Sequence, residues 1–478
     1  MPDGSAGGVP EASMHFPELI PLRDELAAVA AVIGVLREAG GRPVLVGGCV
    51  RDALLGATTK DIDIEVYGLS TQAVESTLAR HFEVITVGAA FGVTKLKNVP
   101  VEVSIPRREN RTGAKHTDFA IEADPTMTAH EAASRRDFTI NAIAWDPASG
   151  TLVDPWGGLA DLRTGVLRHV SGKFGEDALR VLRAMQFAAR FGFIVAPETE
   201  AVCASLPAEH LPRERLLEEW TKLILRGKRP SLGLDFLRRC GWIRHYPELE
   251  AIIGVPQDST WHPEGCVWTH TLHCMDAFAR RRTGDDREDL IVGLAVLCHD
   301  LGKAVTTARG DDGKWHAYRH EEAGVPIAES FLRRLTNESG LIEEVLPHVR
   351  WHDVPHTLYA SGARQASVRR LAMNVGRIDR LLRVELADRQ GRPPIEVGDE
   401  TPQGVWLREQ AAALGITDAR PAPILLGRHL LELGMTPGPS FAPILREAHE
   451  AQIEGAFADL EGGREWLHRR LELPDHPS

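Results

Sequence analysis

Two aspartates two positions apart are the first residues of this sequence that could do chemistry. Asp61 and Asp63 lie in the segment KDIDIEV, which has the alternation of a β-strand. Both carboxylates would share one face of the strand, while Ile62 and Ile64 point into the core. Two carboxylates on one face can hold Mg²⁺ ions that activate a hydroxyl group and neutralise a leaving pyrophosphate. DxD alone would more readily fit two solvent-facing acids on an edge strand.

A glycine pair precedes these acids. In VLVGGCVRDALLG an apolar run ends in Gly47-Gly48, and an apparent helix follows that contains Arg51. Glycines at such a turn let a ligand approach the backbone, the helix N-terminus attracts anions, and Arg51 would add a positive fork for phosphate. A tight turn explains Gly-Gly alone. Together with the two aspartates and a third acid, Glu102 in the run VEV, the pair favours a metal-assisted phosphate site.

Histidines and aspartates in the second half of the chain form another set of candidate ligands. Widely separated helical positions, with one adjacent His-Asp pair, suit a divalent-metal cluster. Neighbours on a helix point about 100° apart, so only close helix packing lets both members of the pair reach one metal. The set consists of His262, His270, His273, His299, Asp300, His320, His348, His352 and Asp388.

The composition is that of a soluble globular protein. Of 478 residues, 43% are hydrophobic and 26% are charged. At roughly 150 residues per domain the length suggests about three domains. A formal net charge of −12 disfavours a general nucleic-acid coat but is compatible with a local basic site.

Neither a membrane span nor a disulfide framework is expected. No apolar run approaches the ~18 residues of a span. The opening segment MPDGSAGGVPEAS has neither a basic nor an apolar stretch, which predicts a mobile tail and not a secretory signal. The six cysteines form no CxxC pair, which favours a reducing, cytoplasmic location.

The elements that position these residues divide the chain into a mixed part and a helical part. A helix is predicted over 22–38, and β-like runs over 44–46, 62–66, 82–86, 92–96 and 101–105. From residue 174 onward the pattern is helical, with breaks at 252–265 and 392–404 and a turn at 434–440. We expect a flexible tail (1–21), an α+β head (22–165), a helical neck (166–255), a second helical domain (256–395) and a helical C-terminal tail (396–478).

The order of the head motifs resembles the nucleotidyltransferase superfamily that includes DNA polymerase beta. More closely, it resembles class II tRNA CCA-adding enzymes and bacterial poly(A) polymerases. The additional signatures are RRDFTINAIAW (135–145), DPWGG (154–158) and EDALRVLRAMQFAARFGF (176–193). The resemblance implies a polymerase-beta-like head followed by an all-α neck, with a tRNA 3′ end, CTP and ATP as partners. No membrane or DNA partner is expected.

The resemblance also implies roles for individual residues. Asp61 and Asp63 would be catalytic and bind Mg²⁺, and Asp154 with Gly157-Gly158 matches a hinge-like element. The nucleotide would be bound by Gly47, Gly48, Arg51, Arg136, Asp137, Asn141, Asp177, Arg180 and Arg183.

Asp177 and Arg180 could read the base directly. Three positions apart on a helix, they would share a face. A carboxylate accepts and a guanidinium donates, which matches the NH₂ donor and ring-nitrogen acceptor that cytosine and adenine both present. Unpaired groups facing uracil or guanine could give discrimination up to ~10⁴. The simpler alternative is a helix ion pair worth ~0.3 kcal/mol.

Two basic segments are candidates for contact with RNA. Residues 107–116 read RRENRTGAKH, and the resembling family carries here a flexible loop that switches from adding C to adding A. Its apparent full length favours complete CCA addition, although a solvated loop is the simpler interpretation. The residues concerned are Arg107, Arg108, Arg111 and Lys115. Arg213, Arg215 and Glu219 (PRERLLEEW) resemble the last neck motif, and a tRNA path could include Arg226, Lys228, Arg229, Arg238 and Arg239.

The histidine and aspartate series resembles the HD phosphohydrolase superfamily in its order H…HD…D. Lys303 matches the HDxGK form, and we interpret Cys274 and Cys298 as core packing. The ligands implied are His270, His299, Asp300 and Asp388, with His320 and His352 as additional ligands; His348 is the alternative to His352. His262 and His273 would be structural. The metal would be a divalent transition ion or Mg²⁺.

The prediction is therefore CCA addition to tRNA, with phosphohydrolase activity of the HD domain on 2′,3′-cyclic or terminal phosphates. A-only addition, CC-only addition and poly(A) synthesis are alternatives within the same chemistry. From another class, an HD nucleotide phosphohydrolase with an RNA-binding head and a non-catalytic RNA-binding protein are both compatible with the sequence.

Overall fold

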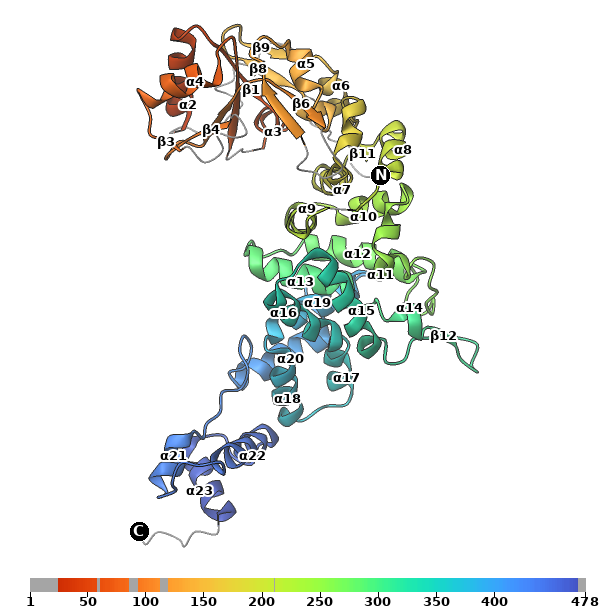
Figure 1. The fold of residues 1–478 in the computed structure, drawn as a ribbon. Helices are drawn as coiled ribbons and strands as arrows, with labels where there is room; N and C mark the ends of the chain where they lie inside the picture. Colours follow the sequence, from red (N-terminus) through yellow and green to blue (C-terminus); the bar gives the residue numbers. More distant parts are fainter. Residues whose placement is uncertain (1–24, 58–60, 86–92, 112–118, 210, 472–478) are drawn as a thin grey trace. The chain divides into compact units, whose positions relative to one another are not determined.

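The computed structural model describes residues 25–57, 61–85, 93–111, 119–209 and 211–471 (Figure 1). The chain forms two compact units. The first contains Met1–Leu223 and Leu232–Trp242, and the second contains Ile224–Ser231 and Ile243–Ser478. Among the residues described, no helix is both long and apolar enough to cross a membrane.

The head is built on one mixed sheet of seven strands in the order β3-β4-β5-β2-β1-β8-β9. Only the pair β2–β5 is parallel; the other neighbours are antiparallel. The strands are β1 (Arg42–Val46), β2 (Ile62–Tyr67), β3 (Val84–Ile85), β4 (Val93–Leu96), β5 (Val101–Ser104), β8 (Ala144–Asp146) and β9 (Thr151–Val153). The predicted α+β head is confirmed.

Helices accompany this sheet in the head. They are α2 (Glu25–Glu38), α3 (Gly48–Leu54), α4 (Thr71–Ala79), α5 (Ala129–Ala133), the 3₁₀ turn η2 (Thr139–Asn141) and α6 (Gly158–Thr164). On β2, Ile62 and Ile64 are fully buried and Asp63 is half-buried, as the alternation predicts. The apolar positions of the strand therefore anchor it in the core and leave the Asp63 side chain partly accessible.

Each of the five predicted β-runs contains a strand, with ends displaced by one or two residues. Two short strands, β8 and β9, were not predicted, because Ala144–Asp146 and Thr151–Val153 are too short to show an alternation. The basic segment predicted as a loop begins as a strand, and this is a correction. β6 (Arg107–Arg111) pairs with β7 (Phe119–Ala123) in an antiparallel ladder, and residues 112–118 lie outside the described part.

The neck is helical, as predicted. It contains η3 (Gly172–Glu176), α7 (Leu179–Phe191), α8 (Pro197–Ser205), α9 (Arg213–Arg226), α10 (Pro230–Arg239), η4 (Trp242–His245) and α11 (Pro247–Glu250), with the parallel pair β10 (Val166–Leu167) and β11 (Ile194–Val195). Phe138 lies edge-on to both Phe174 and Phe187, with ring centroids 5.5 and 5.7 Å apart. This aromatic cluster joins the RRDF segment to α7.

The second unit is almost entirely helical. Its helices are α12 (Val267–Ala279), α13 (Asp286–Cys298), α14 (Lys303–Thr306), α15 (His320–Leu335), α16 (Ser339–Arg350), α17 (Val354–Ala360), α18 (Gln365–Val375), α19 (Ile378–Gln390), α20 (Pro402–Ala413), α21 (Gly427–Glu432), α22 (Phe441–Glu454) and α23 (Leu460–Arg470). A hairpin of β12 (Ala308–Arg309) and β13 (Trp315–His316) interrupts them. Helices α12, α13 and α19 pack against one another (Figure 1).

The C-terminal tail is helical, as predicted. Leu407 and Ala411 of α20 pack into a cluster with apolar residues of α18 and α19, whereas Leu430, Phe457 and Leu467 belong to a cluster formed within the tail. The predicted turn at 434–440 lies between α21 and α22.

Candidate functional sites

The three acids of the head lie at the parallel strand pair. Asp61 immediately precedes β2 and is exposed, and the β2–β5 register places Asp63 opposite Glu102. Burial raises the pKa of Asp63, and the charges of Glu102 and Asp61 raise it further, whereas Arg136 opposes them. A carboxylate whose pKa is raised by neighbouring acids is the kind of group that a divalent cation stabilises. The residues therefore fit the Mg²⁺ site expected here.

The glycine turn closes against this group. Gly47 has φ +77°, and a Cβ atom at this position would lie 2.8 Å from Arg136 Nη1 and 3.6 Å from Asp63 Oδ2. A side chain there would displace the arginine, which explains the glycine independently of the backbone angle. The turn, Arg136 and the acids thus belong to one site.

Arg51 is buried and paired in this structure, and its role as a phosphate fork stays a prediction. Its side chain is only 5% exposed, donates to Asp52 Oδ1 from Nε (2.8 Å) and Nη2 (2.7 Å), and also donates to Asn141. The guanidinium carbon lies 5.1 and 4.8 Å from the ring centroids of Phe187 and Phe191. The neighbouring carboxylate and the rings of α7 hold it inside, so in this structure Arg51 positions other groups.

Asp137 and Asn141 form a buried network with Arg183. Asp137 accepts from Arg183 Nε at 2.6 Å, from Asn141 Nδ2 at 2.7 Å and from the backbone of Phe138 at 2.8 Å. Burial alone would raise the pKa of Asp137, but the Arg183 charge and the hydrogen bonds lower it to about 2. Asp137 is therefore a fixed anion that orients Asn141 and α7.

Asp177 and Arg180 do not share a helix face, which corrects the predicted geometry. Asp177 lies before α7 in extended backbone (φ −129°), and its Oδ1 accepts from Leu179 N at 3.0 Å. Arg180 donates to the carbonyl oxygens of Lys173 (2.8 Å) and Arg135 (2.6 Å). Asp177 Oδ2 lies 3.2 Å from Arg215, a residue of the last neck motif. Both side chains are thus held separately, each by its own partners.

The DPWGG motif caps the N-terminus of α6. Asp154 accepts from the backbone of Gly158 (2.7 Å) and Leu159 (2.9 Å). A Cβ atom at Gly158 would lie 2.1 Å from the carbonyl oxygen of Thr139, so only glycine fits this approach. The motif thus lets α6 pack closely against η2. Its role as a hinge stays a prediction.

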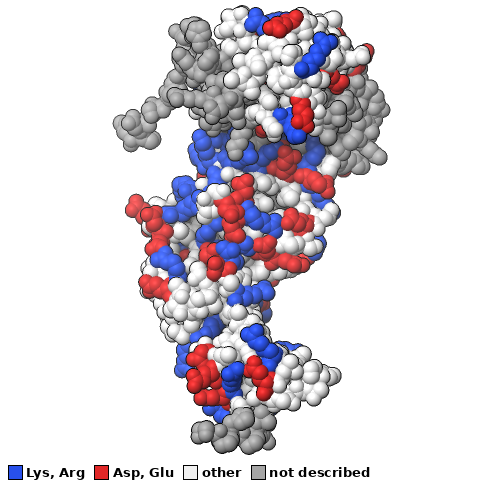
Figure 2. All heavy atoms as spheres, turned by 90° about the vertical axis from the view of Figure 1, so that its left-hand side faces the viewer, with Lys and Arg blue, Asp and Glu red and all other residues white. Residues whose placement is uncertain are grey.

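The basic residues are partly neutralised by neighbouring acids. Arg108 pairs with Asp124 at 2.9 Å, and Asp235 pairs with Arg238 (2.8 Å) and Arg239 (3.1 Å). On the face drawn in Figure 2, Lys and Arg are interspersed with Asp and Glu over the helical part. The side chain of Arg111 and all of Lys115 lie outside the described residues.

In the HD segment, His270, His299 and Asp388 form the deeper part of a candidate metal centre. His270 Nε2 lies 2.9 Å from Asp388 Oδ1, and His299 Nε2 lies 3.9 Å from the same oxygen. The other ring nitrogen of each histidine contacts an oxygen atom: His270 Nδ1 lies 2.8 Å from Glu264, and His299 Nδ1 lies 2.7 Å from the Val296 carbonyl oxygen. Such bonds fix the ring orientation for metal binding through Nε2.

Asp300, His320 and His352 form the outer part of the centre. His320 Nε2 lies 3.3 Å from Asp300 Oδ1 and 3.3 Å from His352 Nε2. Asp300 Oδ2 faces the deeper part, 3.3 Å from His299 Nε2, and accepts from Lys303 at 2.8 Å. Within the described part of the chain, His299 Nε2 and Asp300 Oδ1 make no hydrogen bond although both are buried. Buried polar atoms without partners fit a centre that takes divalent cations.

The structure thus brings together all six predicted ligands from segments far apart in the sequence: His270, His320 and Asp388 lie on helices, and His299, Asp300 and His352 lie in the turns that follow α13 and α16. His348, the alternative to His352, is fully buried but belongs to none of the ligand groups found in the described residues. His262 lies beside the centre and shares Glu264 with His270. Sequence reasoning missed Glu264 and also Cys274, which lies in the deeper ligand group. The signal for Cys274 was its spacing of four from His270, one helical turn.

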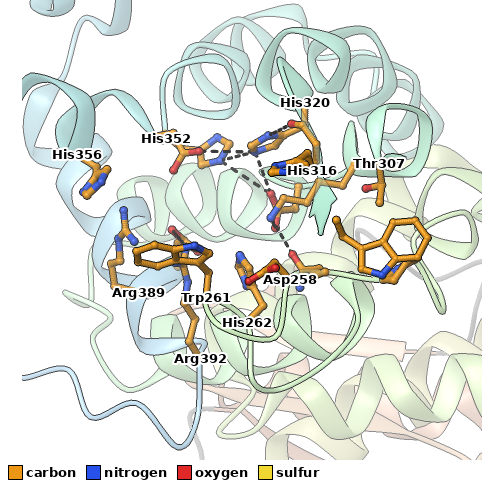
Figure 3. Close-up of a pocket in the computed structure, with 18 residues that line it drawn as sticks. Asp258, Trp261, His262, Thr307, His316, His320, His352, His356, Arg389 and Arg392 are labelled. Atoms are coloured by element: carbon orange, nitrogen blue, oxygen red, sulfur yellow. Dashed lines mark hydrogen bonds and ion pairs between the residues drawn. The ribbon is translucent and has the colours of Figure 1, made fainter. Parts of the chain in front are cut away.

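A pocket of about 300 Å³ opens onto the outer part of the centre (Figure 3). Asp300, His320 and His352 lie in its wall, along with the cationic side chains of Lys303 and Arg392. Trp261, which is 64% exposed, lies beside Arg389 and Arg392 in Figure 3. Cations and an aromatic ring next to a metal centre suit a phosphate ester with an attached planar group.

Comparison with known proteins identifies both domains. The poly A polymerase head domain family matches residues 44–168, and the HD domain family matches residues 267–384. A multifunctional CCA protein of Nitrosococcus oceani is 37% identical over 389 residues, which cover 79% of this chain and 91% of that protein.

Two solved structures share the fold. The Bacillus stearothermophilus CCA-adding enzyme in complex with CTP has a TM-score of 0.62 and 24% identity, covering 94% of this chain and 98% of that chain. The Thermotoga maritima CCA-adding enzyme complexed with tRNA has a TM-score of 0.57 and 20% identity, covering 94% and 96%. The extent of identity with the Nitrosococcus oceani protein, with a matching head and a matching HD domain, shows that this chain belongs to the multifunctional CCA protein family.

Proposed function

We propose that this protein adds CMP, CMP and AMP, taken from CTP and ATP, to the 3′ end of tRNA without a template. The observation that carries the proposal is the group of Asp61, Asp63 and Glu102 beside the Gly47 turn. It occurs in a chain 37% identical to a multifunctional CCA protein. The family and the geometry of the head therefore point to the same chemistry.

The residues have distinct tasks in this reaction. Asp61 and Asp63 would hold Mg²⁺, which when bound offsets triphosphate charge and favours ionisation of the attacking hydroxyl. Arg136 would hold phosphate oxygens, and its position against the Gly47 turn supports this role. The tRNA 3′-oxygen bonds to the α-phosphorus while the bond to pyrophosphate breaks, and the hydroxyl proton passes to solvent.

Selection of C and A would use Asp177 as acceptor of the exocyclic NH₂ group and Arg180 as donor to the ring nitrogen. Arg180 uses two donors on backbone carbonyl oxygens, and a guanidinium has five N–H groups. The backbone bonds hold the group rigid and leave donors for a base. Two side chains held in fixed positions in this way would select the incoming nucleotide without a template strand.

The test uses purified protein, Mg²⁺ and a tRNA lacking its last three nucleotides, with labelled CTP and ATP together and each alone. Growth by three nucleotides ending in A, with a stop after CC when ATP is omitted, is the expected result. Growth by two only, or only on tRNA that already ends in CC, would indicate CC-only or A-only addition. A long A ladder would indicate poly(A) synthesis, and no growth would refute the proposal.

We also propose that the HD centre hydrolyses phosphate esters at nucleotide ends, including 2′,3′-cyclic phosphates. The specific observation is the opening of the pocket onto Asp300, His320 and His352 with Lys303 and Arg392 in its wall. Incubation with a 2′,3′-cyclic nucleotide and added divalent metal should give the ring-opened monophosphate. The Asp300→Asn variant is the blank, and equal turnover by this variant would count against the proposal.

A further inference from the structure

The deeper part of the HD centre contains a thiol in addition to its imidazoles and carboxylates. Cys274 follows His270 by four residues on α12, so both side chains lie on one face of the helix. Its Sγ atom lies 3.3 Å from His270 Nε2, the nitrogen that faces Asp388. The cysteine side chain is fully buried.

Four potential ligand atoms surround this point. One atom each from His270, Cys274, His299 and Asp388 lies within 4.8 Å of every other. Bonds of ~2.3 Å to sulfur and ~2.1 Å to nitrogen or oxygen in a tetrahedral site place neighbouring ligand atoms ~3.5 Å apart. The observed separations of 3.3 Å from sulfur to His270 and 3.9 Å from His299 to Asp388 fit one ion with small adjustments.

Two independent features show that the space is arranged for a ligand. His299 is 1% exposed, and its Nε2 atom, directed into the group, makes no hydrogen bond within the described residues. Gly391 lies against the sulfur, and a Cβ atom there would lie 2.2 Å from Cys274 Sγ. Because Gly391 has no side chain, the sulfur atom of Cys274 can lie beside His270.

We propose that Cys274 is a fourth protein ligand of the deeper metal position and that this position takes a thiophilic ion such as Zn²⁺ or Co²⁺ in preference to Mg²⁺. Sulfur and imidazole ligands select such ions, whereas carboxylate and water ligands suit Mg²⁺. The outer position has Asp300, His320 and His352, contains no sulfur and borders the pocket. Asp388 of the deeper position lies in the pocket wall as well, so the sulfur ligand, and not distance from the pocket, distinguishes the two positions.

The inference refines the metal centre on which the proposed phosphohydrolase function rests, and it can be tested separately. The full-length protein is stripped of metal and titrated with Co²⁺ while its absorption spectrum is recorded. A cobalt–thiolate bond gives a charge-transfer band in the near ultraviolet, whereas the weaker visible bands report cobalt on any ligands. The wild-type protein is expected to show both.

Two variants make the assignment specific. Cys274→Ser should lose the charge-transfer band, keep visible cobalt bands from the remaining ligands, and bind Zn²⁺ at least about tenfold more weakly. Cys298→Ala is the matched control, because Cys298 is equally buried and directly precedes His299 but lies outside the ligand groups. It should keep the wild-type spectrum. Retained visible bands show that a serine variant is still folded around its metal.

An unchanged charge-transfer band in Cys274→Ser, or visible bands without that band in the wild type, would show that Cys274 is only packed beside the centre. The outcome is separable from the proposed function. If the wild-type protein shows the charge-transfer band but hydrolyses no phosphate ester, Cys274 is a metal ligand and the proposed phosphohydrolase function is wrong. If the protein hydrolyses phosphate esters but shows no charge-transfer band, the function is supported and Cys274 is not a ligand.

Discussion

At the scale of single residues, the head has neighbouring carboxylates whose combined charge a divalent cation would offset. Burial and the charges of Glu102 and Asp61 raise the pKa of Asp63, and Arg136 offsets only part of this. The same arrangement that is unfavourable in the free protein favours a divalent ion strongly. Loss of either aspartate should therefore affect catalysis more than folding.

Asp63→Asn and Asp61→Asn should each lower the rate of CMP incorporation at least about 1,000-fold, since a metal contributes several kcal/mol at about 1.4 kcal/mol per tenfold. Single-turnover incorporation into tRNA lacking CCA measures the loss. Glu83→Gln is the control, because Glu83 is an exposed acid paired with Lys97. Near-wild-type rates in the aspartate variants would remove these residues from the metal site.

Base selection is also a property of single residues. Asp177→Asn keeps an oxygen that can accept from Leu179 N, so α7 should begin as before. The new amide can donate to the carbonyl of uracil, and we expect the preference for CTP over UTP to fall by tenfold or more, about 1.4 kcal/mol. The ratio of kcat/KM for the two nucleotides measures this. Glu198→Gln, on α8, should leave the ratio unchanged, and an unchanged ratio in Asp177→Asn would exclude Asp177 from base reading.

At the scale of elements, the HD centre depends on how closely the turn after Asp300 approaches α15. A Cβ atom at Gly302 would lie 1.9 Å from the carbonyl oxygen of His320 and 2.6 Å from the backbone nitrogen of Gly324. These are backbone atoms at the start of α15, so α15 itself would have to move. His320 would move away from Asp300 with it.

Gly302→Ala should destabilise the protein by about 1–3 kcal/mol and lower the metal content of the outer position. Denaturant unfolding and metal analysis measure the two effects. Gly340→Ala is the matched control, since Gly340 lies in α16 with open space around it and should gain up to about 1 kcal/mol. Equal metal content in the two variants would contradict this account of His320.

α16 contributes a buried histidine that does not face the centre. Burial, with the Arg380 charge nearby, lowers the pKa of His348 to about 4, and within the described residues neither ring nitrogen finds a hydrogen-bond partner. Between about pH 6.5 and about pH 4, His348 is protonated in the unfolded chain but neutral in the folded protein. The free energy of unfolding therefore falls by about 1.4 kcal/mol for each pH unit within this window as the pH decreases. Above that window His348 is neutral in both states and has no such effect.

His348→Leu should therefore gain roughly 2 kcal/mol relative to wild type on going from about pH 7 to about pH 5. Urea unfolding at both values measures the difference, and other histidines cancel in the comparison. A constant difference between the two proteins would show that folding does not lower the pKa of His348.

At the scale of the whole molecule, the two candidate sites lie in different compact units. Among the residues that the structure describes, the partners of Asp300 belong to the second unit and those of Asp63 belong to the first. Substitutions at sites without shared partners change each other's effect by only ~0.3–0.5 kcal/mol, about a factor of two. The two activities should therefore be separable by mutation.

Asp300→Asn should abolish phosphate ester hydrolysis while CMP and AMP incorporation stays within about twofold of wild type. Asp63→Asn should show the reverse. The two assays run on one preparation of each full-length variant make the comparison. A large loss of nucleotide addition in Asp300→Asn would show that the sites are coupled.

The sequence alone predicted the longer elements and the residue types of the candidate ligands, because both depend on local spacing and motif order. Alternation placed Asp63 opposite Ile62 and Ile64, and motif order identified the head and the six HD residues. Periodicity also separated the mixed head from the helical remainder. Short or highly charged strands such as β8 and β6 were missed, because a few residues carry too little pattern.

Which faces of distant helices pack against one another became known from the three-dimensional structure. His270 and Asp388 are 118 positions apart, and their contact at 2.9 Å depends on the packing of α12 against α19. The same packing places Cys274 in the ligand group, and other long-range contacts bury Arg51 against α7 and place His352, not His348, beside His320. Spacing within one element cannot contain this information, since it arises where distant elements pack together.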